Sequence, residues 1–247
     1  MIKLVKSCPE FISKGELFHR HDIGLHRPFE YEKLKEISGG AVTDGESFRA
    51  WRHTHPAETL EAFHSAWESK VVAFKLFPYH LPEELIESQI FSRKDVAFAV
   101  LRRRPIESYI SVVKAKAVGV FTKVDTTGMR PELSAENFMV WARRMRTWFK
   151  WVNRSLEARN EPFARIGFEK HVHGLSGEES IGHILGLLRP LGFADVGVPG
   201  EIIEGERQDR EPEYRNRVAN WDAFAAELRA SAQSAKMLKW AERIVEI

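Results

Sequence analysis

The chain has 247 residues, of which 43% are hydrophobic and 29% are charged, and these values exclude disordered and fibrous proteins. The 37 Lys and Arg residues nearly balance the 35 Asp and Glu residues, so the net charge of +2 does not favour a nucleic acid as partner. Clusters of arginine still leave room for a local anion site. We predict a single domain over residues 1–247.

Cysteine content and hydropathy bear on the compartment. Cys8 is the only cysteine, so no internal disulfide can form. No apolar window reaches the length of a membrane span, and the first six residues are too short and too interrupted for a signal peptide. We therefore expect a cytoplasmic protein without a membrane span.

The hydrophobic pattern predicts alternating strands and helices, and hence an α/β fold with a mostly parallel sheet. Strands are expected at residues 71–76, 96–101 and 163–168, and helices at 56–69, 105–118, 134–159, 178–188, 221–229 and 236–245. Residues 192–217 are rich in Gly, Pro and charge and are interpreted mostly as loop. The aromatic stripe of the helix at 134–159 is interpreted as core packing rather than as a nucleotide-stacking surface.

The most informative segment follows the strand at 96–101. Arg103 stands at the end of this strand, Pro105 opens the next helix, and Ser111 lies two turns into that helix. A guanidinium group binds phosphate oxygens in a bidentate manner, and the first turn of a helix adds free backbone N–H groups. Arg103 and Ser111 therefore indicate a site for a phosphate monoester.

A strand, Arg-x-Pro and a helix with serine eight residues after the arginine resemble the sulfotransferases that use 3'-phosphoadenosine-5'-phosphosulfate (PAPS), in their bacterial, carbohydrate or nodulation-type branch. The resemblance implies a three-layer sandwich with a P-loop-like, mostly parallel central sheet. It implies transfer of a sulfuryl group from PAPS to a hydroxyl of a carbohydrate or small-molecule acceptor, without a metal. In that family the arginine and the serine hold the 3'-phosphate, a role that passes to Arg103 and Ser111.

Two further segments carry the same resemblance. The run from Ala73 to Leu81 is similar to the family's second sheet strand, where Lys75 would balance charge on the sulfonate. His80 could accept the acceptor's proton, because imidazoles titrate near neutral pH. The Gly-Glu-Leu-Phe segment that holds Glu16 resembles one in the carbohydrate branch, where a glutamate near this position is the base. Glu16 is therefore the first candidate for general base, and His80 is the alternative.

A late segment resembles the loop that lies near the nucleotide in sulfotransferases. It contains Arg207 and Gln208, which are candidates for contact with the nucleotide or the substrate. Asp222, farther along, is interpreted as an acidic residue at the start of a helix. Histidines gather at His19, His21 and His26 and at His171 and His173, but their spacing does not match a zinc site.

Sulfotransferases open with a strand and a loop of the Arg-Ser-Gly-Thr-Thr type, whose backbone N–H groups cradle the 5'-phosphosulfate. The sequence contains no such segment, so relative to the family the first strand and the loop are missing. A chain shortened at its N-terminus and a non-catalytic remnant that binds 3'-phosphonucleotides both explain this difference. An ATP-dependent phosphotransferase is a further alternative, although the spacing of Arg103 and Ser111 favours a 3'-phosphorylated nucleotide.

Overall fold

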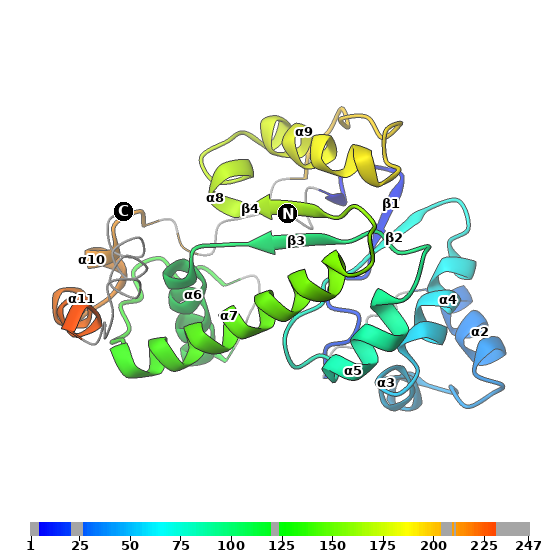
Figure 1. Ribbon diagram of the computed structural model, residues 1–247, viewed down its shortest axis with the longest axis horizontal. Helices are drawn as coiled ribbons and strands as arrows, with labels where there is room; N and C mark the ends of the chain where they lie inside the picture. Colours follow the sequence, from blue (N-terminus) through cyan, green and yellow to red (C-terminus); the bar gives the residue numbers. More distant parts are fainter. Residues whose placement is uncertain (1–4, 21–26, 120–123, 204–208, 210, 231–247) are drawn as a thin grey trace. The chain divides into compact units, whose positions relative to one another are not determined.

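The structure is a computed structural model, and it describes residues 5–20, 27–119, 124–203, 209 and 211–230 (Figure 1). These residues form an α/β protein in which helices predominate. The chain divides into two compact units, each assembled from separate stretches of sequence. Unit 1 comprises Met1–Val100, Trp151–Ile166 and Lys170–Gly205, and unit 2 comprises Leu101–Lys150, Gly167–Glu169 and Glu206–Ile247. The single domain expected from the sequence stays a prediction.

Unit 1 is organised around a pair of short parallel strands. Strand β1 (Phe11–Ser13) lies beside β2 (Val71–Ala73), with Phe11 opposite Val71 and Ser13 opposite Ala73 (Figure 1). The helices of this unit are α2 (Pro28–Ile37), α3 (Gly45–Arg52), α4 (Pro56–Ala66), α5 (Glu83–Leu85), the π-helical turn η1 (Ile86–Phe91), α9 (Gly177–Leu188) and the 3-10 turn η2 (Arg189–Leu191).

Local sequence signals explain where several of these helices begin. Proline opens both α2 and α4, where its missing N–H costs nothing and its fixed φ already suits a helix. Asp44 caps α3, because its carboxylate accepts the backbone N–H of Ser47 at 2.8 Å. Helix α4 packs against α2, and the ring of Phe63 on α4 meets the edge of Phe48 on α3 within the core.

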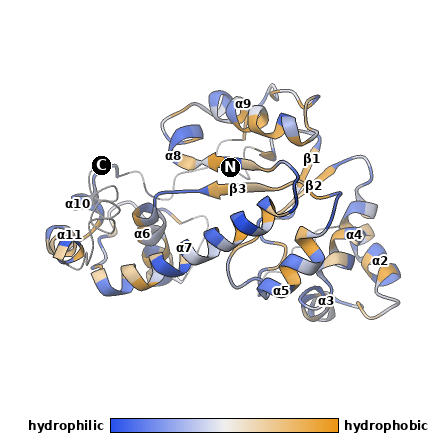
Figure 2. Ribbon diagram, in the orientation of Figure 1, coloured by the Kyte–Doolittle hydropathy of each residue, from blue (hydrophilic) through white to orange (hydrophobic). Residues whose placement is uncertain are grey.

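Unit 2 is mostly helical. It contains α6 (Pro105–Val118), α10 (Tyr214–Arg217), α11 (Trp221–Ala230) and the first part of α7 (Ala135–Glu157), whose last residues belong to unit 1. Its core joins Ile106 and Ile110 of α6 to Phe138 of α7 and Phe224 of α11, and all four side chains are fully buried. Figure 2 shows the alternating hydrophobic and hydrophilic positions along these helices that produce such buried faces.

A second strand pair consists of β3 (Ala99–Arg102) and β4 (Ala164–Gly167). Both arrows point in the same direction in Figure 1, and β3 leads into α6 while β4 leads into the short helix α8 (Phe168–His171). Within the described residues the strands therefore form separate two-stranded sheets and not one continuous sheet.

Most predicted elements are present, with shifted ends. The helix predicted at 105–118 is confirmed with those bounds, and the helices at 134–159 and 221–229 are confirmed to within two residues. The strands predicted at 71–76 and 96–101 are shorter or displaced. Val100 is the only buried residue of β2 and β3, whereas the patterns indicated buried strands. Part of the loop predicted at 192–217 forms α10. The helix predicted at 236–245 lies outside the described residues.

Candidate functional site

The ends of β1 and β2 carry two of the residues predicted from the sequence. The parallel pairing continues beyond both strands, because the Lys14 N–H donates to Ala73 O at 2.8 Å and the Lys75 N–H donates to Gly15 O at 2.6 Å. Gly15 adopts a φ of +59°, a left-handed conformation that suits glycine and turns the chain after this last bond. Glu16 and Lys75 thus emerge together at the carboxyl ends of parallel strands, where ligands commonly bind.

Glu16, Lys75 and His80 form one group, called here the Glu16 cluster. Lys75 Nζ lies 3.1 Å from Glu16 Oε1, and His80 Nε2 lies 3.7 Å from Glu16 Oε2. The Glu16 and Lys75 side chains are about one third exposed, at 31% and 33%, whereas His80 is 7% exposed. The structure therefore brings together all three residues that the sequence singled out for catalysis, although nearly sixty positions separate the first two.

A tight turn from Phe77 to His80 orients the imidazole. The His80 N–H donates to Phe77 O at 3.2 Å, with Pro78 second in the turn and Tyr79 third at a φ of +78°. These features define a type II turn. The same two residues form a second hydrogen bond, in which the Phe77 N–H donates to His80 Nδ1 at 3.3 Å. With Nδ1 accepting, the tautomer that fits carries its proton on Nε2, facing Glu16.

Glu16 is a strongly stabilised carboxylate. The approach of His80 and the charge of Lys75 outweigh the opposing effect of burial, and together they lower the pKa of Glu16 from 4.5 to about 2. The carboxylate is therefore ionised at neutral pH. It can accept hydrogen bonds or a proton, but it is a weak base.

A buried ion pair supports the segment that carries Glu16. Lys14 is 4% exposed and its ammonium bonds to the carboxylate of Glu30, which is 1% exposed. Trp67 Nε1 donates to the same carboxylate at 2.8 Å, and the Phe63 ring lies 4.8 Å from Lys14 Nζ. Burial lowers the pKa of Lys14 despite this pairing. Because Lys14 precedes Gly15 directly, the pair fixes the backbone from which Glu16 departs.

In unit 2, Arg103 and Ser111 also come together, as predicted, at what we call the Arg103 site. Arg103 Nη1 lies 3.5 Å from Ser111 Oγ, and the ring centroid of Phe168 lies 4.9 Å from the guanidinium carbon. A residue absent from the prediction is Glu107, whose Oε2 accepts Arg103 Nη2 at 3.0 Å. A carboxylate thus already satisfies part of the guanidinium that was expected to bind phosphate.

Glu107 belongs to a partly buried charge network. Its other oxygen accepts Arg217 Nη1 at 2.8 Å, Arg217 Nε donates to Asp209 Oδ2 at 2.9 Å, and Lys114 Nζ donates to the same atom at 2.7 Å. Burial opposes ionisation of Glu107, but Arg217 and Arg103 more than compensate, so its pKa is lowered. Burial and the neighbouring Glu107 charge raise the pKa of Tyr214 to about 12, so its phenol stays protonated.

A carboxylate of the protein lies at the N-terminal end of α6. The N–H of Arg104, the residue just before the helix, donates to Glu169 Oε1 at 2.8 Å. The positive end of the helix thus faces a carboxylate of the protein itself, which is the favourable arrangement when no outside anion is present. Of the other nucleotide candidates, Arg207 and Gln208 lie outside the described residues.

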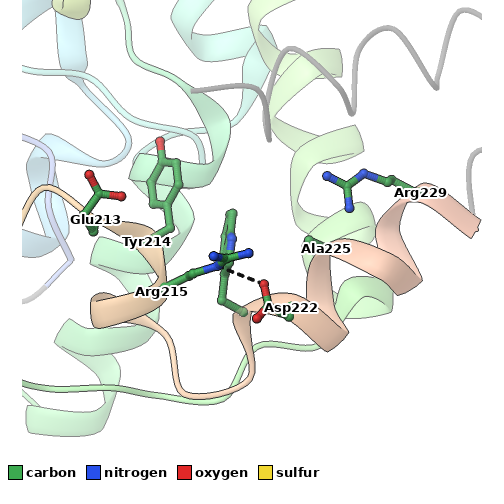
Figure 3. A pocket seen from close by; sticks show the side chains of 7 residues that line it. Glu213, Tyr214, Arg215, Asp222, Ala225 and Arg229 are labelled. Atoms are coloured by element: carbon green, nitrogen blue, oxygen red, sulfur yellow. Dashed lines mark hydrogen bonds and ion pairs between the residues drawn. The ribbon is translucent and has the colours of Figure 1, made fainter.

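A surface pocket of ≈ 260 Å³ lies elsewhere in unit 2, between α10 and α11 (Figure 3). Arg215 Nε donates to Asp222 Oδ1 at 3.0 Å across it, and both side chains are about three quarters exposed. Asp222 lies in the first turn of α11, as the sequence predicted. The pocket contains none of the residues predicted for catalysis or for binding, and the geometry of the Glu16 cluster is the stronger indication of chemistry.

Two features are absent from the part of the chain that the structure describes, namely a cluster of metal ligands and a helix able to span a membrane. No group of three or more His, Cys, Asp or Glu side chains there could hold a metal ion. The described helices include none with both the length and the apolar character that crossing a bilayer requires. No protein-family model matches the chain, and no similar curated protein or solved structure was found.

Sequence reasoning missed several residues that shape both sites. Glu107 lies four residues after Arg103 at the start of a predicted helix, and this i,i+4 spacing was a signal that could have revealed the pair. Glu30, Asp209 and Arg217 gave no comparable signal, because their partners are distant in sequence.

Proposed function

We propose that this chain acts as a PAPS-dependent sulfotransferase that transfers a sulfuryl group to a hydroxyl of a carbohydrate or small-molecule acceptor. The observation that supports the proposal most is the Glu16 cluster. Lys75 and His80 come from one sequence segment and Glu16 from another, and all three were chosen for one reaction. Lys75 Nζ lies 3.1 Å and His80 Nε2 lies 3.7 Å from the Glu16 carboxylate, at the ends of parallel strands.

The proposal assigns the proton acceptor role to Glu16. PAPS supplies the sulfuryl group; the acceptor oxygen forms the new bond to sulfur while the bond between sulfur and the phosphate oxygen breaks, and 3',5'-ADP leaves with that electron pair. The acceptor hydroxyl becomes strongly acidic as its oxygen bonds to sulfur, so a carboxylate with a pKa of about 2 can still accept the proton. Its exposure of 31% leaves it within reach of a substrate.

His80 and Lys75 support that carboxylate. Both ring nitrogens of His80 have a protein neighbour, Phe77 N at 3.3 Å and Glu16 Oε2 at 3.7 Å, so His80 is better suited to position Glu16 than to act as base. The Lys75 ammonium, 3.1 Å from Glu16, would stabilise negative charge that develops on the transferred group.

Arg103 and Ser111 fit the 3'-phosphate of the nucleotide. The side chain of Arg103 is 35% exposed, and the 3.5 Å separation between its Nη1 and the serine hydroxyl leaves both able to bind a shared oxygen acceptor. A phosphate would have to displace Glu107 from Arg103. In that exchange Glu107 would keep its 2.8 Å bond to Arg217.

The finer predictions of fold and location belong to the same proposal. A sulfotransferase would be a three-layer sandwich with a P-loop-like, mostly parallel central sheet, and we propose a cytoplasmic location. The parallel pairing of β1 with β2 and the passage from β3 into α6 support the proposed fold.

Thermal unfolding with 3',5'-ADP, 5'-AMP or ATP tests the nucleotide part of the proposal. A ligand at a concentration of about a hundred times its dissociation constant should stabilise the native state by about 2.7 kcal/mol. The midpoint of thermal unfolding should then rise by a few degrees. We expect a shift with 3',5'-ADP alone, and we expect Arg103→Ala to abolish it. Arg102→Ala, which alters the neighbouring exposed arginine, is the matched control and should keep the shift.

Transfer itself is tested by incubating the chain with ³⁵S-labelled PAPS and a panel of saccharides and small alcohols. Labelled product that disappears in Glu16→Gln would support the proposal. Absence of both a 3',5'-ADP shift and labelled product would overturn it, whereas a shift without product would favour the non-catalytic alternative.

A further inference from the structure

Two exposed aromatic side chains belong to the turn that positions His80. Phe77 is 43% exposed and Tyr79 is 49% exposed, whereas Phe18, Phe48 and Phe63 of the same unit are at most 1% exposed. Phe29 of the same unit is similarly exposed, at 42%, but Phe77 and Tyr79 belong to the turn that carries His80 of the Glu16 cluster. Exposed aromatic rings beside polar groups are common in ligand sites, and part of each ring is open to a ligand.

The backbone at Tyr79 strengthens this point. The third position of a type II turn requires a positive φ and favours glycine, yet Tyr79 occupies it at +78°. The other positive-φ residues that the structure describes are glycines, apart from Asn160, a residue type that tolerates this region. A tyrosine held at a positive φ beside a polar cluster marks a candidate functional position.

Phe77 is fixed against the Glu16 cluster. Its ring centroid lies 5.4 Å from Lys75 Nζ and 5.5 Å from the His80 ring, which it meets at 89°. The cluster therefore orients this ring, while the exposed part of the ring stays open to a ligand. A molecule that lies on the ring is brought near the Lys75 ammonium, which itself lies 3.1 Å from Glu16 Oε1.

We propose that Phe77 and Tyr79 form an acceptor subsite that stacks against the apolar face of a pyranose ring and presents a hydroxyl of that ring to Glu16. This inference rests on the proposed function and names its acceptor class. The C–H groups on one face of a pyranose match the negative face of an aromatic ring. The equatorial hydroxyls at its rim can hydrogen-bond to the Glu16 carboxylate and the Lys75 ammonium, whereas an aliphatic chain cannot.

Ligand-observed saturation-transfer NMR without PAPS tests the subsite directly. The probes are cellotetraose, whose β-linked rings have flat apolar faces, and 2-naphthol, an aryl alcohol. We expect saturation of the cellotetraose C–H protons by the wild-type chain. Loss of one aromatic contact should weaken binding by about threefold to tenfold.

The variants separate ring loss from misfolding. Tyr79→Gly removes the ring and relieves the positive φ, so its thermal midpoint should equal or exceed that of the wild type while cellotetraose binding falls. Tyr79→Phe keeps the ring and should keep the binding. Phe77→Leu should also weaken binding, whereas Phe29→Leu, at a phenylalanine of α2 that is 42% exposed, should not.

The outcomes distinguish this inference from the proposed function. Binding of cellotetraose that survives both Tyr79→Gly and Phe77→Leu would overturn the subsite, as would binding of 2-naphthol alone or of neither probe. Cellotetraose binding that needs both rings would support it, even if the PAPS assays fail and the proposed reaction is abandoned.

Discussion

The Glu16 cluster and the Arg103 site are both made of opposite charges, but different forces hold them in place. Backbone hydrogen bonds position the Glu16 cluster: the Lys75 N–H bonds to Gly15 O at the strand ends, and the His80 N–H bonds to Phe77 O in the type II turn. Side chains position the Arg103 site, since Glu107, Arg217 and Asp209 orient one another.

The comparison shows which kind of site tolerates change. A backbone-built site keeps its shape when one of its side chains is replaced, because strands and turns remain paired. A side-chain network loses several contacts when one member is removed, since each charge serves two partners. We therefore expect substitutions in the Glu16 cluster to change the free energy of unfolding by about 1 kcal/mol at most. Substitutions in the network around Glu107 should affect stability more, and binding with it.

The largest effect should come from the ion pair that supports the Glu16 segment. Lys14→Met removes the ammonium from a carboxylate that is 1% exposed, and breaking a buried pair in this way costs about 3 kcal/mol. Urea unfolding would measure the change in the free energy of unfolding. Lys33→Met is the matched control in the same unit, because the Lys33–Glu36 pair is exposed and should contribute much less to the free energy of unfolding. Equal losses in the two variants would contradict the prediction.

Arg217→Met should break the charge network of unit 2 and lower the free energy of unfolding by about 2 kcal/mol. Arg217 is 5% exposed and serves both Glu107 and Asp209, whose charges the substitution leaves without that partner. Arg215→Met tests the same helix at a position that is 74% exposed, and it should change the free energy of unfolding by less than about 0.5 kcal/mol. Affinity for 3',5'-ADP should also fall in Arg217→Met, since released Glu107 would compete more strongly for Arg103.

Glu16→Gln should reveal a pH-dependent contribution to stability. The pKa of Glu16 is lowered from 4.5 to about 2 in the folded chain, so its carboxylate stabilises the fold above pH 4.5 and loses that effect as the pH falls toward 2. Because the side chain is one third exposed, we expect only about 1 kcal/mol. Wild type should exceed Glu16→Gln by this amount at pH 7, and the gap should close near pH 2 to 3. A constant gap would contradict the assigned cause.

The residues of the Glu16 cluster could be predicted because their segments resemble those of sulfotransferases. The contact that joins Glu16 to Lys75 spans 59 positions and depends on the pairing of β1 with β2, which no local signal revealed. Helix α6 was predictable from local signals, since Pro105 stands at its start and Gly119 at its end.

The charge network of unit 2 could not be predicted because it depends on contacts between distant segments. Lys114 and Asp209 are separated by 95 positions, and Glu107 and Arg217 by 110. Hydrophobic periodicity reveals which face of a helix is buried, but it does not reveal which charged residue from another segment will be buried beside it. Glu169 is a similar case, since it satisfies the Arg104 N–H from 65 positions away.

The smallest expected effect is that of Ser111→Ala, and it tests whether the Arg103 site binds a phosphate. Ser111 Oγ lies 3.5 Å from Arg103 Nη1, a weak contact whose loss should hardly change stability. If both groups bind a 3'-phosphate, Ser111→Ala removes one hydrogen bond. The affinity for 3',5'-ADP should then fall by about fivefold, or about 1 kcal/mol. Affinity for 5'-AMP, which lacks that phosphate, should not change. Ser108→Ala, on the same helix, is the control and should bind 3',5'-ADP as the wild type does. An equal loss in both serine variants would mean that the helix, rather than the Ser111 hydroxyl, determines binding.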